Sequence, residues 1–144
     1  MNKEQLKSLI LSKKSFLCIG LDPNLDFFPK HILKEDDPIF SFNKQIIDAT
    51  KEYCVSYKIN LAFFERYGEE GIISLRKTLN YIPKDLFIIA DGKRGDILHS
   101  SKMCADSLYK ELHFDAATLN PYMGEDAIMP FKKEGKWSII LSAT

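Results

Sequence analysis

The sequence contains no apolar run of 18 residues, so it predicts no membrane-spanning helix. Its first residues, 1–5, are polar and include Glu4, which is unlike a secretory signal peptide. The chain also has no excess of charge of either sign, with 20 basic and 20 acidic side chains. This balance argues against binding to nucleic acid through a basic surface.

Cysteine is scarce as well. The three cysteines, Cys18, Cys54 and Cys104, are an odd number and show no short spacing typical of a metal site. Cys18 and Cys54 lie in or beside apolar segments, which favours buried free thiols over reactive ones. Free thiols fit a reducing compartment, so we expect a cytoplasmic protein without a bound metal.

Apolar segments of strand length alternate with segments of helical periodicity along the chain. The predicted strands cover residues 16–21, 55–61, 86–93, 114–120 and 137–143. The predicted helices cover residues 4–11, 38–49, 69–79, 97–112 and 126–133, the second opening with an acidic cap and a proline. This alternation predicts an α/β fold, in which helices cover a parallel sheet.

Polar side chains gather where the predicted strands end. Asp22 follows the first strand, Lys58 and Asn60 end the second, and Asp91 and Lys93 end the third. The carboxyl ends of parallel strands lie at one edge of a sheet, where active sites of such folds are found. The sequence therefore predicts one polar site built from several strands.

The spacing of these residues sharpens the prediction. Residues i and i+2 of a strand share a face, so Asp91 and Lys93 point the same way, as do Lys58 and Asn60. Charges at the end of a buried strand are costly unless they are paired, so we expect these groups to hold one another in place. Asp96 opens the next helix and is expected to cap it.

The ordered motifs carry a resemblance to a known family. Residues 91–97 read Asp-x-Lys-x-x-Asp-Ile, and residues 21–23, 58–65 and 120–124 match further segments of the family in the expected order. The chain from residue 16 onward resembles the orotidine 5'-monophosphate decarboxylase family, in particular its longer-chain branch. Asp-x-Lys alone is a weak signal, whereas the ordered set is specific.

The resemblance implies a (β/α)8 TIM barrel, of which about the first five β/α units are present. Such a barrel needs roughly 250 residues, so residues 1–144 are expected to be the N-terminal part of a single barrel domain. The implied activity is decarboxylation of orotidine 5'-monophosphate to uridine 5'-monophosphate in pyrimidine biosynthesis. The implied assembly is a homodimer, and no metal or organic cofactor is expected.

The resemblance also assigns roles to matched positions. The expected catalytic residues are Lys58, Asp91, Lys93 and Asp96, with Lys93 as the general acid. The expected substrate-binding residues are Asp22, Asn60, Ile97, Ser100 and Thr144. Asp96, Ile97 and Ser100 are expected to reach the partner subunit's site across the dimer interface.

Two alternatives stay open at this point. Sugar-phosphate decarboxylases or aldolases of the same superfamily share Asp-x-Lys-x-x-Asp but depend on magnesium, and carry an acidic residue where this chain has Lys58. The lysine favours the metal-free nucleotide decarboxylase. The second alternative is a non-catalytic truncated protein that retains half of the site as a binding or assembly partner.

Overall fold

A computed structural model describes residues 1–142 and contains one five-stranded parallel sheet. Its strands are β1 (Cys18–Leu21), β2 (Ser56–Asn60), β3 (Phe87–Arg94), β4 (Ala116–Leu119) and β5 (Trp137–Ile140). They lie side by side in chain order, β1-β2-β3-β4-β5, and every neighbouring pair is parallel. This confirms the predicted α/β class and the five predicted strands.

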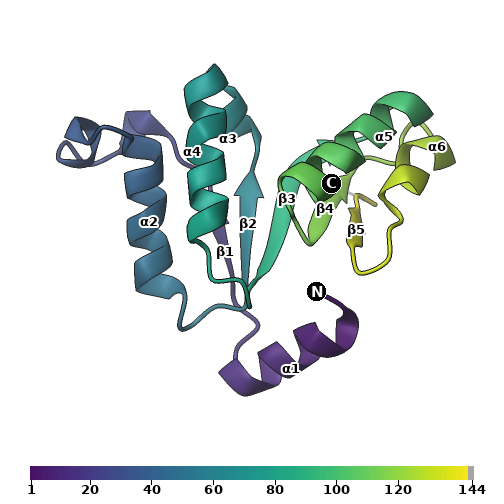
Figure 1. Ribbon diagram of the computed structural model, residues 1–144, viewed down its shortest axis with the longest axis horizontal. Helices are drawn as coiled ribbons and strands as arrows, with labels where there is room; N and C mark the ends of the chain where they lie inside the picture. The colour runs from purple at the N-terminus through teal and green to yellow at the C-terminus, as the bar shows by residue number, and fades with distance from the viewer. Residues whose placement is uncertain (143–144) are drawn as a thin grey trace.

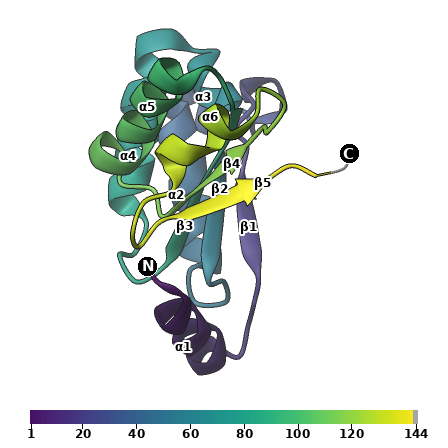
Figure 2. The same cartoon turned by 90° about the vertical axis from the view of Figure 1, so that its right-hand side faces the viewer.

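The helices are α1 (Lys3–Lys13), α2 (Pro38–Thr50), α3 (Ala62–Glu65), α4 (Gly68–Tyr81), α5 (Leu98–Asp106) and α6 (Glu125–Ile128). Helix α1 lies beyond the amino ends of the strands (Figure 1). Helices α4, α5 and α6 cover one side of the sheet (Figure 2). The short helix α3 was not predicted from the sequence, because its four residues are too few to show a period.

The start of α2 agrees with the prediction. Asp37 is the N-cap, its Oδ1 accepts a hydrogen bond of 3.0 Å from the Phe40 N–H, and Pro38 occupies the first turn. The same carboxylate accepts hydrogen bonds from the Ser74 hydroxyl at 2.7 Å and the Lys77 ammonium at 2.8 Å. One aspartate therefore both starts α2 and joins it to α4.

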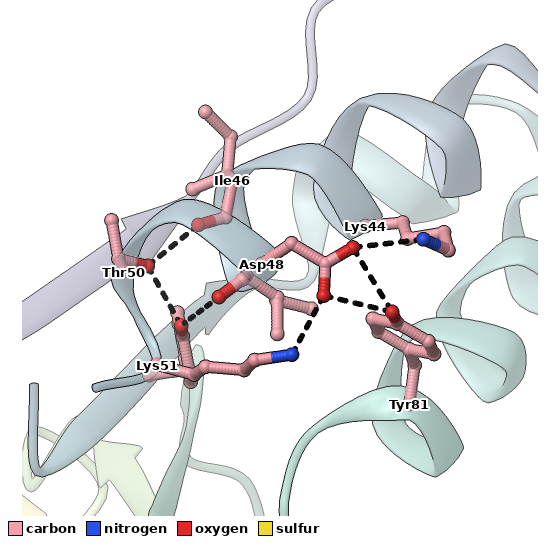
Figure 3. Close-up of polar contacts among 8 residues, drawn as sticks. Lys44, Ile46, Asp48, Thr50, Lys51 and Tyr81 are labelled. Atoms are coloured by element: carbon pink, nitrogen blue, oxygen red, sulfur yellow. Dashed lines mark hydrogen bonds and ion pairs between the residues drawn. The ribbon is translucent and has the colours of Figure 1, made fainter.

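The other end of α2 is fixed by the hydroxyl groups of two tyrosines, Tyr57 and Tyr81, of which Tyr81 is labelled in Figure 3. The Tyr57 hydroxyl on β2 lies 2.7 Å from Thr50 Oγ1 and donates to the Ile47 carbonyl at 3.3 Å. On the surface, the Tyr81 hydroxyl of α4 donates to both oxygens of the Asp48 carboxylate, at 2.8 and 3.0 Å. The first contact is buried against the sheet, whereas the second is exposed to solvent.

The helix predicted over 97–112 is shorter in the structure. Helix α5 ends at Asp106, and a wider, π-helical turn follows at Ser107–Glu111. The Leu112 N–H bonds the Ser107 carbonyl at 3.0 Å, five residues back, which is the spacing of that wider turn. The apolar period continues through the turn, which is why the sequence does not mark the change.

The strand register decides which side chains share a face. Lys58 pairs with Ile89, and Ile89 pairs with Ala116. Because side chains alternate along a strand, Lys58, Asp91 and Thr118 point to the same face. The opposite face packs against the helices and contains the buried Tyr57 and Leu119 among the core residues. Within residues 1–142, no helix has the length and apolarity needed to span a membrane.

Candidate active site

The Asp91 carboxylate is the centre of the candidate site. Its side chain is only 8% exposed and lies in the second half of β3, before the last residue of that strand, Arg94. Oδ2 accepts a hydrogen bond of 2.7 Å from the Lys58 ammonium, and Oδ1 accepts one of 2.6 Å from the Lys93 ammonium. The predicted pairing of these three charges is therefore present.

These contacts keep the carboxylate ionised. Burial opposes ionisation, but the hydrogen bonds from Lys58, Lys93 and Thr118 outweigh it and lower the pKa of Asp91 to about 2. Burial likewise opposes the charge of Lys58, and the neighbouring Asp91 carboxylate outweighs it, so the pKa of Lys58 is raised. Two ammonium groups around one carboxylate leave this part of the site with a net positive charge.

Lys93 sits in an unusual backbone conformation. Its φ is +46°, in the left-handed region that residues other than glycine rarely adopt. Its side chain is 53% exposed, although its ammonium group contacts the buried Asp91 carboxylate. A strained residue with an accessible charge next to a buried one is typical of functional sites.

Thr118 on β4 is a site residue that the sequence reasoning missed. Its hydroxyl donates to Asp91 Oδ1 at 3.0 Å and accepts from the Lys93 N–H at 2.9 Å. The signal that could have revealed it is a polar residue in a strand whose other residues are apolar and buried, Ala116, Ala117 and Leu119.

The segment after Asp91 is fixed on its outer side. The Arg94 guanidinium forms an ion pair with Glu65 of α3, and the Arg94 carbonyl accepts from the Asn120 N–H at 2.8 Å. Gly95 passes so close to Asn120, the residue after β4, that an added Cβ would clash with the Asn120 carbonyl oxygen. The end of β3 is therefore joined to α3 on one side and to the residue after β4 on the other.

Asp96 does not behave as the predicted helix cap. The N-cap of α5 is Ile97, which makes no side-chain cap hydrogen bond. Asp96 Oδ1 accepts a hydrogen bond of 2.7 Å from the adjacent Ile97 N–H. The Ser101 hydroxyl binds the backbone N–H and carbonyl of Asp96 rather than its carboxylate. Within residues 1–142, its exposed carboxylate forms no ion pair, so Asp96 stands apart from the three paired charges.

The remaining predicted site residues lie around this centre with different exposures. Asn60 is next to Asp91 in the register, and its Oδ1 accepts from the Ala62 N–H at 3.2 Å. Asp22 is exposed after β1, where its charge contributes to raising the pKa of Lys58. Ser100 is partly buried in the first turn of α5. Thr144 lies outside the described residues.

The donor set does not suit a metal ion. Both oxygens of Asp91 are bound by ammonium groups, which repel a second cation. Across residues 1–142, no three side chains of His, Cys, Asp and Glu gather closely enough to hold a metal.

Comparison with known proteins identifies the family. The profile of the orotidine 5'-phosphate decarboxylase / HUMPS family matches residues 15–142. The chain belongs to this family. Proteins named orotidine 5'-phosphate decarboxylase from Phocaeicola vulgatus and Bacteroides fragilis are 55% and 53% identical over the whole chain. The chain spans 54% of the length of each of these relatives.

Solved structures agree with the sequence relatives. The structure of Leishmania donovani OMP decarboxylase is 34% identical, with a TM-score of 0.85 over 98% of this chain and 53% of that one. The structure of Leishmania donovani UMP synthase is also 34% identical, with a TM-score of 0.86 over 98% of this chain and 30% of that one. The five β/α units therefore have the arrangement found in the TIM barrels of this family.

Proposed function

We propose that the protein to which this chain belongs converts orotidine 5'-monophosphate to uridine 5'-monophosphate in pyrimidine biosynthesis, without a metal or organic cofactor. The family membership and the names of the similar proteins support this proposal. The observation that carries it is the buried Asp91 carboxylate between two ammonium groups, of which Lys93 is half exposed. This set can hold an anion and deliver a proton.

The reaction explains the need for Lys93. When the bond between C6 and the carboxylate breaks, its electron pair stays on C6, and no adjacent carbonyl accepts the charge. A fixed ammonium group beside C6 stabilises this carbanion, a contribution on the order of 3–4 kcal/mol for one well-placed donor. Lys93 then transfers a proton to C6, carbon dioxide leaves, and the neutral amine recovers its proton from solvent.

Asp91 and Lys58 have complementary proposed roles. The low pKa of Asp91 keeps a negative charge in the site throughout the physiological pH range. Next to the substrate carboxylate this charge disfavours the bound substrate relative to the transition state, in which the negative charge has moved to C6. Lys58 holds Asp91 by its Oδ2 and leaves Oδ1 to orient the Lys93 ammonium.

Substrate contacts and assembly are part of the proposal. Asp22, Asn60, Ser100 and Thr144 are proposed to bind the nucleotide. A homodimer is proposed in which Asp96 and Ile97 of each subunit complete the partner's site. Asp96 would be the fourth charged group of that site, and Ile97 would cover the pyrimidine. The exposed Asp96 carboxylate, which forms no ion pair within residues 1–142, supports such an interface. So do the exposed apolar side chains of Ile97, Leu98 and Met103, which are 57%, 46% and 61% exposed.

The domain and its location complete the proposal. Residues 1–144 are proposed to be the N-terminal part of one (β/α)8 barrel, since the five strands are sequential and parallel and the similar proteins are about twice as long. The cytoplasm is the proposed location, because the three cysteines are free thiols, which fit a reducing compartment. A magnesium-dependent sugar-phosphate enzyme is disfavoured by the contact of Lys58 with Asp91. A non-catalytic remnant is disfavoured by the pairing of both lysines with Asp91.

The test is turnover by the protein expressed from its uninterrupted gene. Loss of orotidine monophosphate absorbance is followed with and without a chelator. Equal turnover in both samples supports the proposal. Turnover that disappears with the chelator favours the magnesium-dependent alternative, and a folded protein without turnover refutes the proposed activity.

The shared site has a separate test. Asp96→Ala and Lys93→Ala proteins, each inactive alone, are mixed under conditions in which subunits exchange. Up to about one quarter of wild-type activity is expected, since half of the dimers are mixed and each of these holds one intact site. No recovery after demonstrated exchange refutes the contribution of Asp96 across the interface.

A further inference from the structure

The hydroxyl of Thr118 is buried on a strand that is otherwise apolar. The residue is 7% exposed, and the other members of β4 are fully buried alanines and a leucine. Burying a hydroxyl is unfavourable unless it is hydrogen-bonded. Thr118 forms both of its hydrogen bonds with the site, one with the Asp91 carboxylate and one with the Lys93 backbone.

The strand register explains why the Lys93 N–H needs this partner. Strands β3 and β4 pair at Ala90 and Ala117, and pair again only at Arg94 and Leu119. The chain advances four residues on β3 and two on β4, so the segment from Asp91 to Lys93 bulges out of the regular ladder. The Thr118 side chain replaces the backbone acceptor that a regular ladder would offer.

The bulge also gives Lys93 its left-handed backbone, with φ of +46°. Such a conformation costs about 1–2 kcal/mol for a residue other than glycine and persists only where the surroundings fix it. It brings the Lys93 ammonium back onto Asp91, two residues earlier, at 2.6 Å. Thr118 contacts both ends of this loop, the backbone of Lys93 and the carboxylate of Asp91.

We propose that Thr118 is a positioning residue of this site, whose hydroxyl fixes the backbone of Lys93 and the orientation of the Asp91 carboxylate so that the ammonium is held for reaction. The inference rests on the proposed function and deepens it. Thr118 itself is not proposed to touch the substrate.

Two matched variants of the full-length protein isolate the hydroxyl. Thr118→Val keeps the shape of the side chain and removes both hydrogen bonds, whereas Thr118→Ser keeps the hydroxyl and removes a methyl group. Losing a group that orients a metal ligand typically reduces activity on the order of ten- to hundredfold. By analogy, a fall in kcat of the same order is expected for Thr118→Val. KM is expected to change little, because the loss affects the transition state rather than substrate binding.

Hydrogen exchange of the Lys93 amide provides a readout that does not require turnover. The amide is expected to be protected in the wild type and in Thr118→Ser, and to exchange faster in Thr118→Val. Thr118→Ala, which leaves space instead of filling it, is the second variant if the valine protein does not fold. If Thr118 had a purely structural role, its variants would lose stability, but the exchange rate of the Lys93 amide would not differ between Thr118→Val and Thr118→Ser.

The outcomes separate this inference from the proposed function. Wild-type protein that does not turn over orotidine monophosphate overturns the function, while the exchange data still test the Thr118 contact. Active wild type together with a Thr118→Val protein of unchanged kcat overturns the positioning role. So does a serine variant that loses as much kcat as valine, or a Lys93 amide that is unprotected in the wild type.

Discussion

Replacement of Lys93 by alanine tests the proposed chemistry most directly. The substitution removes an ammonium group that is 53% exposed and leaves Asp91 bound to Lys58 and Thr118. Ion pairs with an exposed partner contribute about 0–1 kcal/mol, so the free energy of unfolding should change by no more than about 1 kcal/mol. Alanine is also not glycine, so the cost of the left-handed backbone remains.

The expected effect on catalysis is far larger. Loss of one well-placed electrostatic donor reduces kcat about 10²–10³-fold, and loss of a general acid reduces it about 10²–10⁴-fold. Because one side chain performs both tasks, the two effects do not simply multiply. A fall in kcat of about 10²–10⁴-fold is expected, with binding of uridine monophosphate, measured by calorimetry, largely retained.

A Lys93→Arg variant separates the two tasks. Arginine keeps the positive charge but does not give up its proton at neutral pH. If proton transfer matters, the arginine protein should remain at least tenfold below wild type in the absorbance assay, a gap of about 1.4 kcal/mol. Full activity of the arginine protein would refute Lys93 as the acid, and activity of the alanine protein within tenfold of wild type would refute the whole role.

Three further outcomes are expected for stability. The pKa of Asp91 lies below its ordinary value, so its ionised form stabilises the fold above about pH 4, and this stabilisation is lost as the pH falls towards 2. The expected loss in the free energy of unfolding is about 2 kcal/mol. Denaturant titrations of Asp91→Asn should not show this loss, because asparagine does not ionise. Gly95→Ala should lower the thermal midpoint because the new Cβ meets a backbone oxygen, whereas Gly20→Ala, with its nearest contact at 3.8 Å, should not. Tyr57→Phe, which removes a buried hydroxyl, should cost about 1 kcal/mol, and Tyr81→Phe, which removes an exposed one, less than about 0.5 kcal/mol.

Each of these stability predictions has a clear contradicting result. Parallel acid titration curves for wild type and Asp91→Asn would show that the ion pairs do not stabilise the fold. Equal thermal midpoints for the two alanine variants would show that the close approach of Gly95 is easily relieved. Equal losses for the two phenylalanine variants would show that burial of the Tyr57 hydroxyl contributes nothing.

The sequence predicts the sheet and the three paired charges because both follow from simple periodicities. Near-continuous apolar segments imply a parallel sheet, and the carboxyl ends of parallel strands must meet. Alternation along β3 and β2 then places Asp91 near Lys58, as the structure shows. These steps require only residue type and spacing, so they succeed without knowledge of side-chain contacts.

Other parts of the site depend on register, which a single sequence does not specify. Thr118 is an ordinary strand residue until β4 is aligned with β3, and only then does its hydroxyl meet Asp91. The prediction that Asp96 caps α5 was wrong, because α5 begins one residue later than expected and its N-cap is Ile97. The contact of Lys93 with Asp91 was predicted from regular alternation, but it forms through a bulge and a left-handed residue.

The end of β3 is where local preference and structure disagree most, and the disagreement identifies the site. A lysine with positive φ, a broken ladder and a buried carboxylate are each unfavourable alone. They coexist because Thr118 bonds the segment on one side and the Arg94–Glu65 ion pair holds it on the other. A regular strand would have satisfied the backbone at less cost and would also have placed Lys93 on the face of Asp91. The left-handed backbone changes the direction from which the Lys93 ammonium reaches the Asp91 carboxylate. The irregularity is therefore explained by the position it gives the ammonium group, as expected where function overrides local propensity.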